Sequence, residues 1–147
     1  MMDSREKRES FPPVLIDIPV WQNYFRKEER TFREVNILMD AGRVCCLDFI
    51  VAELLYNAAT EEEMKIFQDF TRIFPILQEK PGTGTWVEAA RLAFKLRQKG
   101  EKLSLRDCYI AVMAKGHEVL LYTINKGIRK VRRTIGLKLF PEGRVPE

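Results

Sequence analysis

Short apolar runs with strand character alternate along this chain with longer segments of helical periodicity, and this alternation restricts the fold more than any other feature. Strands are predicted at 13–17, 43–46, 73–77 and 118–123, with a shorter one at 137–140. Helices are predicted at 20–41 with a break near Glu29, and at 48–58, 61–71, 85–99, 104–115 and 126–134. The pattern favours a three-layer α/β/α fold with a central, mostly parallel sheet of four to five strands.

Three carboxylates lie inside apolar segments. Asp17 ends the run Val14–Ile16, Glu53 lies in the segment FIVAELL, and Asp107 lies in the segment LRDCYIAVMA. An ionised carboxylate taken out of water costs several kcal/mol unless something compensates its charge. The compensating group is a nearby Lys or Arg, a hydrogen-bonding amide or a divalent metal, and the sequence leaves these three alternatives open.

Each acid also has an ordinary structural explanation. Asp17 before Ile-Pro is typical of a turn in which the side chain bonds its own backbone. Ser104 and Asp107 have the spacing of a helix capping box. Glu53 lies in a helix that is apolar on nearly every side, which predicts a largely buried helix, so pairing with Lys or Arg is its ordinary explanation. In an open parallel sheet, however, ligands bind beyond the carboxyl ends of the strands, where Asp17 and Asn125 fall.

The order and spacing of these acids resemble the PIN-domain nucleases, and most closely the compact VapC-type ribonuclease toxins of toxin–antitoxin pairs. The most specific motifs are VLIDIPVW at 14–21 and DCYIAVMA at 107–114, and VAELLYNA at 51–58 carries the acidic Glu. The segments WVEAARLAFKLRQKG at 86–100 and LLYTIN at 120–125 are similar to the intervening helix and the late strand. The resemblance covers 13–140, with a flexible polar tail expected at 1–12 and another tail at 141–147.

The resemblance implies a divalent-metal-dependent endoribonuclease that hydrolyses RNA as the toxin of a toxin–antitoxin pair. It implies that Asp17, Glu53 and Asp107 are catalytic and bind Mg²⁺ or Mn²⁺, with Asn125 as a further metal ligand and Thr123 in a supporting role. It also implies an RNA substrate, a cognate antitoxin and a homodimer.

The chain departs from the family pattern in two places. Ile18 and Pro19 stand where the family has Thr or Ser, and Asn125 stands where it has a fourth Asp. An amide removes a negative charge and should weaken divalent binding. Three alternatives therefore stay open: a catalytically degenerate PIN-like domain that binds RNA or a partner, a PIN nuclease of RNA processing outside a toxin pair, and an unrelated α/β interaction module.

Basic residues gather just after Asn125, while the chain as a whole carries a formal net charge of only +4. Four of them share one helical face and are the candidates for binding an RNA backbone: Lys126, Arg129, Lys130 and Arg133. A solvated helix face explains them equally well. Apolar side chains between Tyr24 and Leu38 are expected mostly in the core, with some at a dimer or antitoxin surface.

Several chemistries and locations are excluded. Cys45, Cys46 and Cys108 form no Cys-x-x-Cys pair and are expected to be buried and reduced, which argues against a zinc site. His117 is the single histidine, which rules out a ribonuclease mechanism with two histidines. No Walker A loop, nucleophile elbow, membrane-spanning run or secretory signal is present, so one cytoplasmic domain is expected.

Overall fold

The fold is built on a short parallel sheet. The computed structural model describes residues 11–141, so the tails expected at 1–12 and 141–147 lie almost entirely outside the described residues. Strand β1 (Val14–Ile16) lies between β2 (Val44–Cys45) and β3 (Leu120–Tyr122), and it pairs with both in parallel. The predicted α/β class with a parallel sheet is confirmed.

The sheet has fewer strands than the four to five predicted. Within residues 11–141 the predicted strand at 73–77 contributes only an isolated parallel bridge from Ile76 to Cys46. The predicted strand at 137–140 likewise contributes only a bridge from Leu139 to Leu121. Pro75 lies within the first segment and Pro141 directly follows the second. Proline has no N–H to donate to a ladder, which is why neither segment continues as a strand.

The helices agree closely with the predicted segments. They are α2 (Ile18–Phe25), α3 (Glu29–Asp40), α4 (Asp48–Tyr56), α5 (Glu61–Thr71), α6 (Thr85–Gln98), α7 (Leu105–Gly116) and α8 (Lys126–Ile135). The predicted break near Glu29 is confirmed, and Lys27 has a positive φ of 59° within it. Helix α2 begins two residues earlier than predicted because Asp17 caps its N-terminus and Pro19 is tolerated in its first turn.

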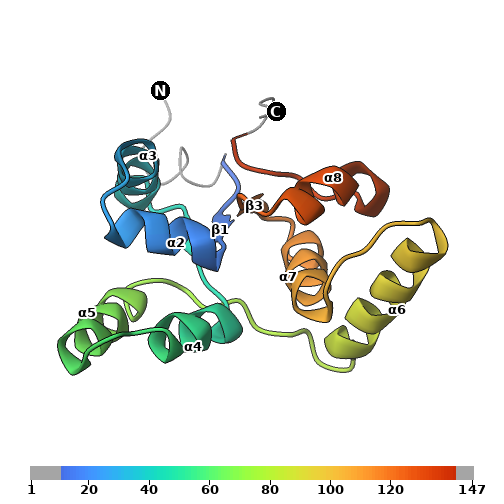
Figure 1. Ribbon diagram of the computed structural model, residues 1–147, viewed down its shortest axis with the longest axis horizontal. Coiled ribbons are helices and arrows are strands. Elements are labelled where there is room, and N and C mark those ends of the chain that lie inside the picture. Colours follow the sequence, from blue (N-terminus) through green and yellow to red (C-terminus); the bar gives the residue numbers. More distant parts are fainter. Residues whose placement is uncertain (1–10, 142–147) are drawn as a thin grey trace.

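The sheet lies between two groups of helices. Figure 1 shows α2, α3, α4 and α5 on one side of β1 and β3, and α6, α7 and α8 on the other. All three residues of β1 are fully buried, and α7 packs against both β3 and α6. The buried indole of Trp21 contacts Phe70 and Phe74, which ties α2 to α5 and the segment after it. This packing holds the carboxyl ends of β1 and β3 at one side of the molecule.

Helix α4 is less buried than its sequence predicts. Only Ile50 and Leu54 are buried in it, and the side chain of Tyr56 is 88% exposed. The prediction of a largely buried helix is therefore wrong. The physical reason is that α4 packs against α2 and α5 on one side and leaves its outer face in solvent.

The cysteines and the histidine have structural surroundings. Cys45, Cys46 and Cys108 are free thiols in the core, as expected. Burial raises the pKa of the Cys45 and Cys46 thiols to about 12, so both stay protonated at neutral pH. His117 follows α7, and its Nε2 lies 2.7 Å from the Gln78 carbonyl oxygen. Among the helices of residues 11–141, none has both the length and the apolar character that a bilayer crossing requires.

Candidate active site

Asp17 lies where the sheet ends and α2 begins. Its N–H donates to the Tyr122 carbonyl at 3.0 Å, so the ends of β1 and β3 are joined directly at this residue. The carboxylate is buried, with 1% of its side chain exposed. Its Oδ1 accepts from the Ile18 N–H at 2.8 Å, and its Oδ2 accepts from the Thr123 hydroxyl at 3.0 Å. Asp17 therefore has the local capping role that its sequence context indicates, and Thr123 positions its second oxygen.

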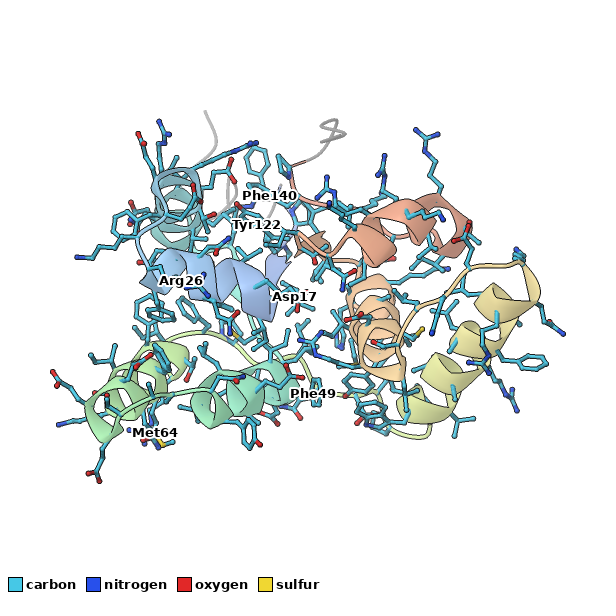
Figure 2. The ribbon with its side chains drawn as sticks, viewed as in Figure 1. Asp17, Arg26, Phe49, Met64, Tyr122 and Phe140 are labelled. Carbon is cyan, nitrogen blue, oxygen red and sulfur yellow. The ribbon has the colours of Figure 1, made fainter. Side chains whose placement is uncertain are left out.

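The three predicted acids converge on one guanidinium group. Arg106 donates from Nε to Glu53 at 2.6 Å, from Nη1 to Asp107 at 2.8 Å and from Nη2 to Asp17 at 3.2 Å. The acids come from α4, from the first turn of α7 and from the end of β1. Figure 2 shows Asp17 at the start of α2, between the two groups of helices. The compensating group whose identity the sequence left open is thus an arginine of the chain itself.

The electrostatic balance of this cluster is incomplete. Burial disfavours the charged guanidinium, but the hydrogen bond that it donates to Glu53 and the negative charge of Asp17 outweigh this effect and raise the pKa of Arg106 above its ordinary value. Arg106 therefore stays charged at any pH at which the protein is folded. One cation among Asp17, Glu53 and Asp107 leaves the cluster with an excess of negative charge. The cluster can therefore accept further positive charge.

Three helix N-termini meet at the cluster. Asp17 caps α2, and Asp107 lies in the first turn of α7, where the Ser104 hydroxyl accepts from the Asp107 N–H at 3.1 Å. Asn125 caps α8, because its Oδ1 accepts from the Ile128 N–H at 3.1 Å. The positive ends of helix dipoles stabilise nearby anions, so the backbone offsets part of the repulsion among the carboxylates. The predicted cap at Ser104 is confirmed, while the Asp107 carboxylate is bound by Arg106 and Asn125.

Asn125 belongs to the cluster, but with its amide nitrogen. Its Nδ2 donates to Asp107 Oδ2 at 3.0 Å. The carbonyl oxygen that a metal ligand would offer is instead used by the N-terminus of α8. Helix capping sets this orientation, because only the oxygen can accept from the Ile128 N–H. In this geometry Asn125 therefore offers its amide N–H, and not its carbonyl oxygen, to the cluster.

The sequence profile of the PIN domain family matches residues 14–134, which include all three acids. The chain belongs to the PIN domain family. This confirms the family that the sequence motifs predict. Among curated protein sequences, none matches the chain.

Several solved structures share this fold. VapBC-1 from nontypeable Haemophilus influenzae matches 86% of this chain and 95% of the matched chain, with a TM-score of 0.66 and 16% identity. FitAcB from Neisseria gonorrhoeae gives a TM-score of 0.62 at 18% identity, over 86% of this chain and 96% of that one. VapBC2 from Rickettsia felis, bound to a DNA fragment from its promoter, covers the same shares with a TM-score of 0.61 and 18% identity. At these identities the similarity shows the fold.

The side chains at the centre of this PIN domain suit a hard cation by their chemistry. Carboxylate oxygens are the ligands that Mg²⁺ and Mn²⁺ prefer. Within residues 11–141, however, no three His, Cys, Asp or Glu side chains stand close enough together to hold one ion. Arg106 separates the oxygens that a metal would gather. The donor set fits, provided that Arg106 moves out of the cluster.

Arg106 is the site residue that the sequence did not single out. It pairs with Asp17 across 89 positions and with Glu53 across 53, and pattern analysis does not detect such contacts. One signal was present: Arg106 is the cation that directly precedes Asp107 at the start of a mostly apolar helix. A cation next to a buried acid is the first partner to examine.

The basic residues predicted to bind an RNA backbone differ in their contacts and exposure. The Arg129 guanidinium donates to the Thr123 carbonyl at 2.9 Å, and Lys130 lies 3.5 Å from Glu101. Burial and the neighbouring charge of Arg132 lower the pKa of Arg129. Lys126 and Arg133 form no ion pair within the described part of the chain and are exposed. All four lie on α8, whose first turn adjoins Asp107 through Asn125.

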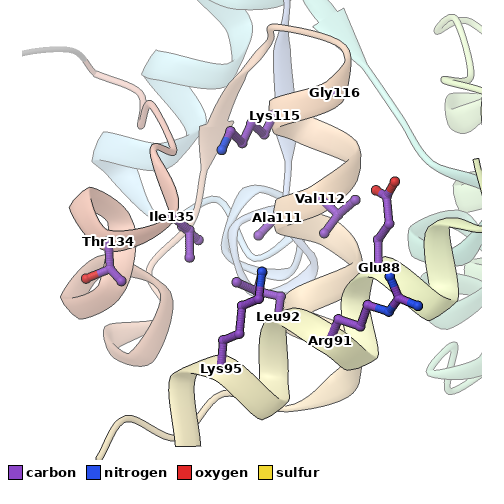
Figure 3. A pocket seen from close by; sticks show the side chains of 10 residues that line it. All are labelled: Glu88, Arg91, Leu92, Lys95, Ala111, Val112, Lys115, Gly116, Thr134 and Ile135. Atoms are coloured by element: carbon purple, nitrogen blue, oxygen red, sulfur yellow. The ribbon is translucent and has the colours of Figure 1, made fainter. Parts of the chain in front are cut away.

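A hollow lies away from the acidic cluster. It measures about 670 Å³ between α6, α7 and α8, and it is lined near the C-terminal end of α7 by Lys115, Val112 and Gly116. Figure 3 shows Arg91 and Lys95 of α6 and Thr134 of α8 around the same hollow. Asp107 lies in the opposite, N-terminal turn of α7. The hollow is therefore separate from the candidate active site.

We expect Arg106→Gln to lower the free energy of unfolding by roughly 3 kcal/mol in metal-free buffer, the low end of the effect of removing one partner of a buried ion pair. The variant leaves three carboxylates facing one another without the guanidinium. Urea unfolding with a chelator present measures the change. Arg72→Gln is the matched control, since Arg72 pairs with Asp69 on the surface and should change stability by under about 1 kcal/mol. Equal effects of the two substitutions would contradict a stabilising role for Arg106.

Proposed function

We propose that this PIN domain is a divalent-metal-dependent endoribonuclease that hydrolyses RNA phosphodiester bonds and acts as the toxin of a toxin–antitoxin pair. The observation that carries the proposal is the convergence of Asp17, Glu53 and Asp107 on one cation beyond the carboxyl ends of β1 and β3. Membership of the PIN family supports it, because PIN domains are generally nucleases.

Asp17, Glu53 and Asp107 are the residues that would hold Mg²⁺ or Mn²⁺. Bound there, a divalent ion supplies a nucleophile from water at neutral pH and offsets the charge that develops on the scissile phosphate. Arg106 uses oxygens of the same three carboxylates. Ion and guanidinium therefore compete, and Arg106 has to leave at least part of the cluster for the ion to bind.

Two polar neighbours would hold the carboxylates in place during this exchange. Thr123 donates to Asp17 Oδ2, and Asn125 donates to Asp107 Oδ2. Neither contact involves Arg106, so both persist when the guanidinium leaves. Thr123 and Asn125 are therefore positioning residues in the proposed site.

Helix α8 is proposed to contact the RNA backbone next to the site. Lys126 and Arg133 are its exposed cations without ion pairs in the described part of the chain, and Arg129 and Lys130 complete the face. The N-terminus of α8 lies at the acidic cluster, so a strand that enters the cluster can continue along this face. Contacts of this kind bind phosphates regardless of base sequence.

The partners that we propose are an antitoxin and a second copy of the chain. One solved structure with this fold is a toxin–antitoxin complex from Klebsiella pneumoniae. A groove of about 380 Å³ between α2, α4 and α5 is lined by apolar residues such as Phe25 and polar ones such as Arg26 and Glu63, and it is the surface that we propose for a partner segment. On α3, the partly exposed ring of Phe32 stacks on Tyr24 of α2. Ile37 of the same helix is well exposed. An RNA-cleaving toxin of this kind acts in the cytoplasm, the location that we propose.

A PIN domain that binds RNA or a partner without cutting is the second candidate. Two observations favour it: Arg106 already pairs with all three acids, and Asn125 supplies a donor where the family has a fourth carboxylate. Metal-dependent cleavage of RNA separates this candidate from the nuclease. A neighbouring reading frame for a small DNA-binding protein separates a toxin from a nuclease of RNA processing.

We expect Mg²⁺ or Mn²⁺ to raise the melting temperature of the parent protein, since an ion that binds only the folded state stabilises it. Asp17→Asn and Asp107→Asn should each abolish this gain and the cleavage of a single-stranded RNA. Asn retains the capping geometry at Asp17, so the metal-free fold should survive. Asp48→Asn, an exposed first-turn acid of α4, is the control and should keep both properties. Full metal-dependent cleavage by either site variant would rule out the assignment.

We expect Asn125→Asp to have opposite effects with and without metal. The new carboxylate would face Asp107 Oδ2 at the place where an N–H now donates, so the melting temperature in chelator should fall. The added negative charge should tighten binding of Mg²⁺, so the gain in melting temperature on adding the ion should grow. Asp is also a good helix cap, which keeps α8 intact. Unchanged melting temperatures in both buffers would show that position 125 lies outside the metal site.

A further inference from the structure

An array of aromatic rings leads from the acidic cluster to the surface. The Arg106 guanidinium lies over the Phe49 ring, 5.6 Å from its centroid. The Phe49 ring in turn lies edge to face with Trp86, at a centroid distance of 5.9 Å. Figure 2 shows Phe49 on the side of α4 that faces α7. Only one aromatic ring therefore separates the Arg106 side chain from Trp86.

Trp86 is held flat against a buried ring. Its indole is stacked on Tyr109 of α7, with centroids 3.9 Å apart and an interplanar angle of 14°. Tyr109 is buried and also contacts Phe49 edge to face, so the support is fixed on two helices. Stacking on one face orients the indole before any ligand binds. Little conformational entropy remains to be lost when a ligand stacks on it.

Trp86 remains exposed beside the site, although it is one of the largest apolar side chains. Its exposed fraction is 40%, whereas Trp21, the other tryptophan, is 1% exposed in the core. Core packing accounts for Trp21 and for the covered face of Trp86. It does not account for an indole surface that stays open to solvent one aromatic ring away from the Arg106 guanidinium.

A flat, exposed and rigid aromatic surface suits an unpaired nucleobase. Stacking on aromatic side chains is how proteins bind splayed bases of single strands, and it tolerates any base because each has a π-face. Only the Phe49 ring separates Arg106 from Trp86, so a strand with its phosphate at the acidic cluster would have a base close to Trp86. The position of Trp86 therefore matches what a single-stranded substrate would present.

We propose that Trp86, supported by Tyr109 and Phe49, is a stacking site for an unpaired base near the scissile phosphate of a single-stranded nucleic acid. The choice of ligand rests on the proposed nuclease function. The stacking itself requires neither metal nor cleavage. The two proposals can therefore fail separately.

The test is binding of a short oligoadenylate to the full chain in chelator, where no cleavage occurs. Trp21 is buried, so quenching of tryptophan fluorescence should report on Trp86. By anisotropy of a labelled oligonucleotide, Trp86→Ala should bind about 5- to 150-fold more weakly, the range that loss of one stacked base gives. Trp86→Phe keeps a ring and should retain most of the affinity. Phe94→Ala is the matched control, because Phe94 is also exposed on α6 but lies outside the array.

Oligonucleotides with a single abasic position sharpen the test. At one position, loss of the base should weaken binding to the parent protein and have no further effect on Trp86→Ala. Equal affinities of the parent and Trp86→Ala, or absent binding to the parent, would overturn the proposal. So would a change of oligomeric state in Trp86→Ala by light scattering, since it would make the surface a protein interface. If the parent protein binds the oligonucleotide through Trp86 but cleaves no RNA when metal is added, that result would count only against the nuclease function.

Discussion

The ion pairs of Arg106 with three carboxylates are the interaction on which the candidate site depends. Asp17, Glu53 and Asp107 repel one another, and the fold brings them together only because a guanidinium and three helix N-termini offset that repulsion. The carboxyl ends of parallel strands meet at one edge, so the acid that ends β1 and the residues that follow β3 must be neighbours. The sheet topology thus helps to bring these groups together, and Arg106 offsets the repulsion among the carboxylates.

This arrangement connects stability with activity. A metal-free PIN domain with three unpaired acids would be destabilised, whereas here the chain supplies its own cation. In the proposed site the same cation occupies oxygens that a divalent ion would need, so greater stability without metal would go with weaker affinity for metal. Asn125 acts in the same direction, because an amide donor next to Asp107 replaces what would otherwise be another repelling carboxylate. The site is therefore adapted to be stable without metal.

The sequence predicted the helices well and singled out the three acids that converge on Arg106, but it predicted the contacts between elements poorly. Helical periodicity and caps such as Ser104 are local, so the bounds of α7 and α8 follow from a few neighbouring residues. The predicted strand near Ile76 is only a single bridge, because the apolar pattern does not show that Pro75 has no N–H to donate to a sheet. The order of Asp17 and Asp107 indicated the family, but the role of Arg106 depends on packing among α2, α4 and α7, which no local pattern contains.

The most direct measurement of the central claim is the affinity for Mn²⁺, by calorimetric titration, of the parent protein and of Arg106→Gln. If the guanidinium and the ion compete for Asp17, Glu53 and Asp107, removing the guanidinium should tighten Mn²⁺ binding by at least about tenfold, which corresponds to about 1.4 kcal/mol. Arg106→Lys keeps the charge and should remain closer to the parent. Equal or weaker affinity in Arg106→Gln would contradict the account, because Arg106 would then not occupy the place of the ion.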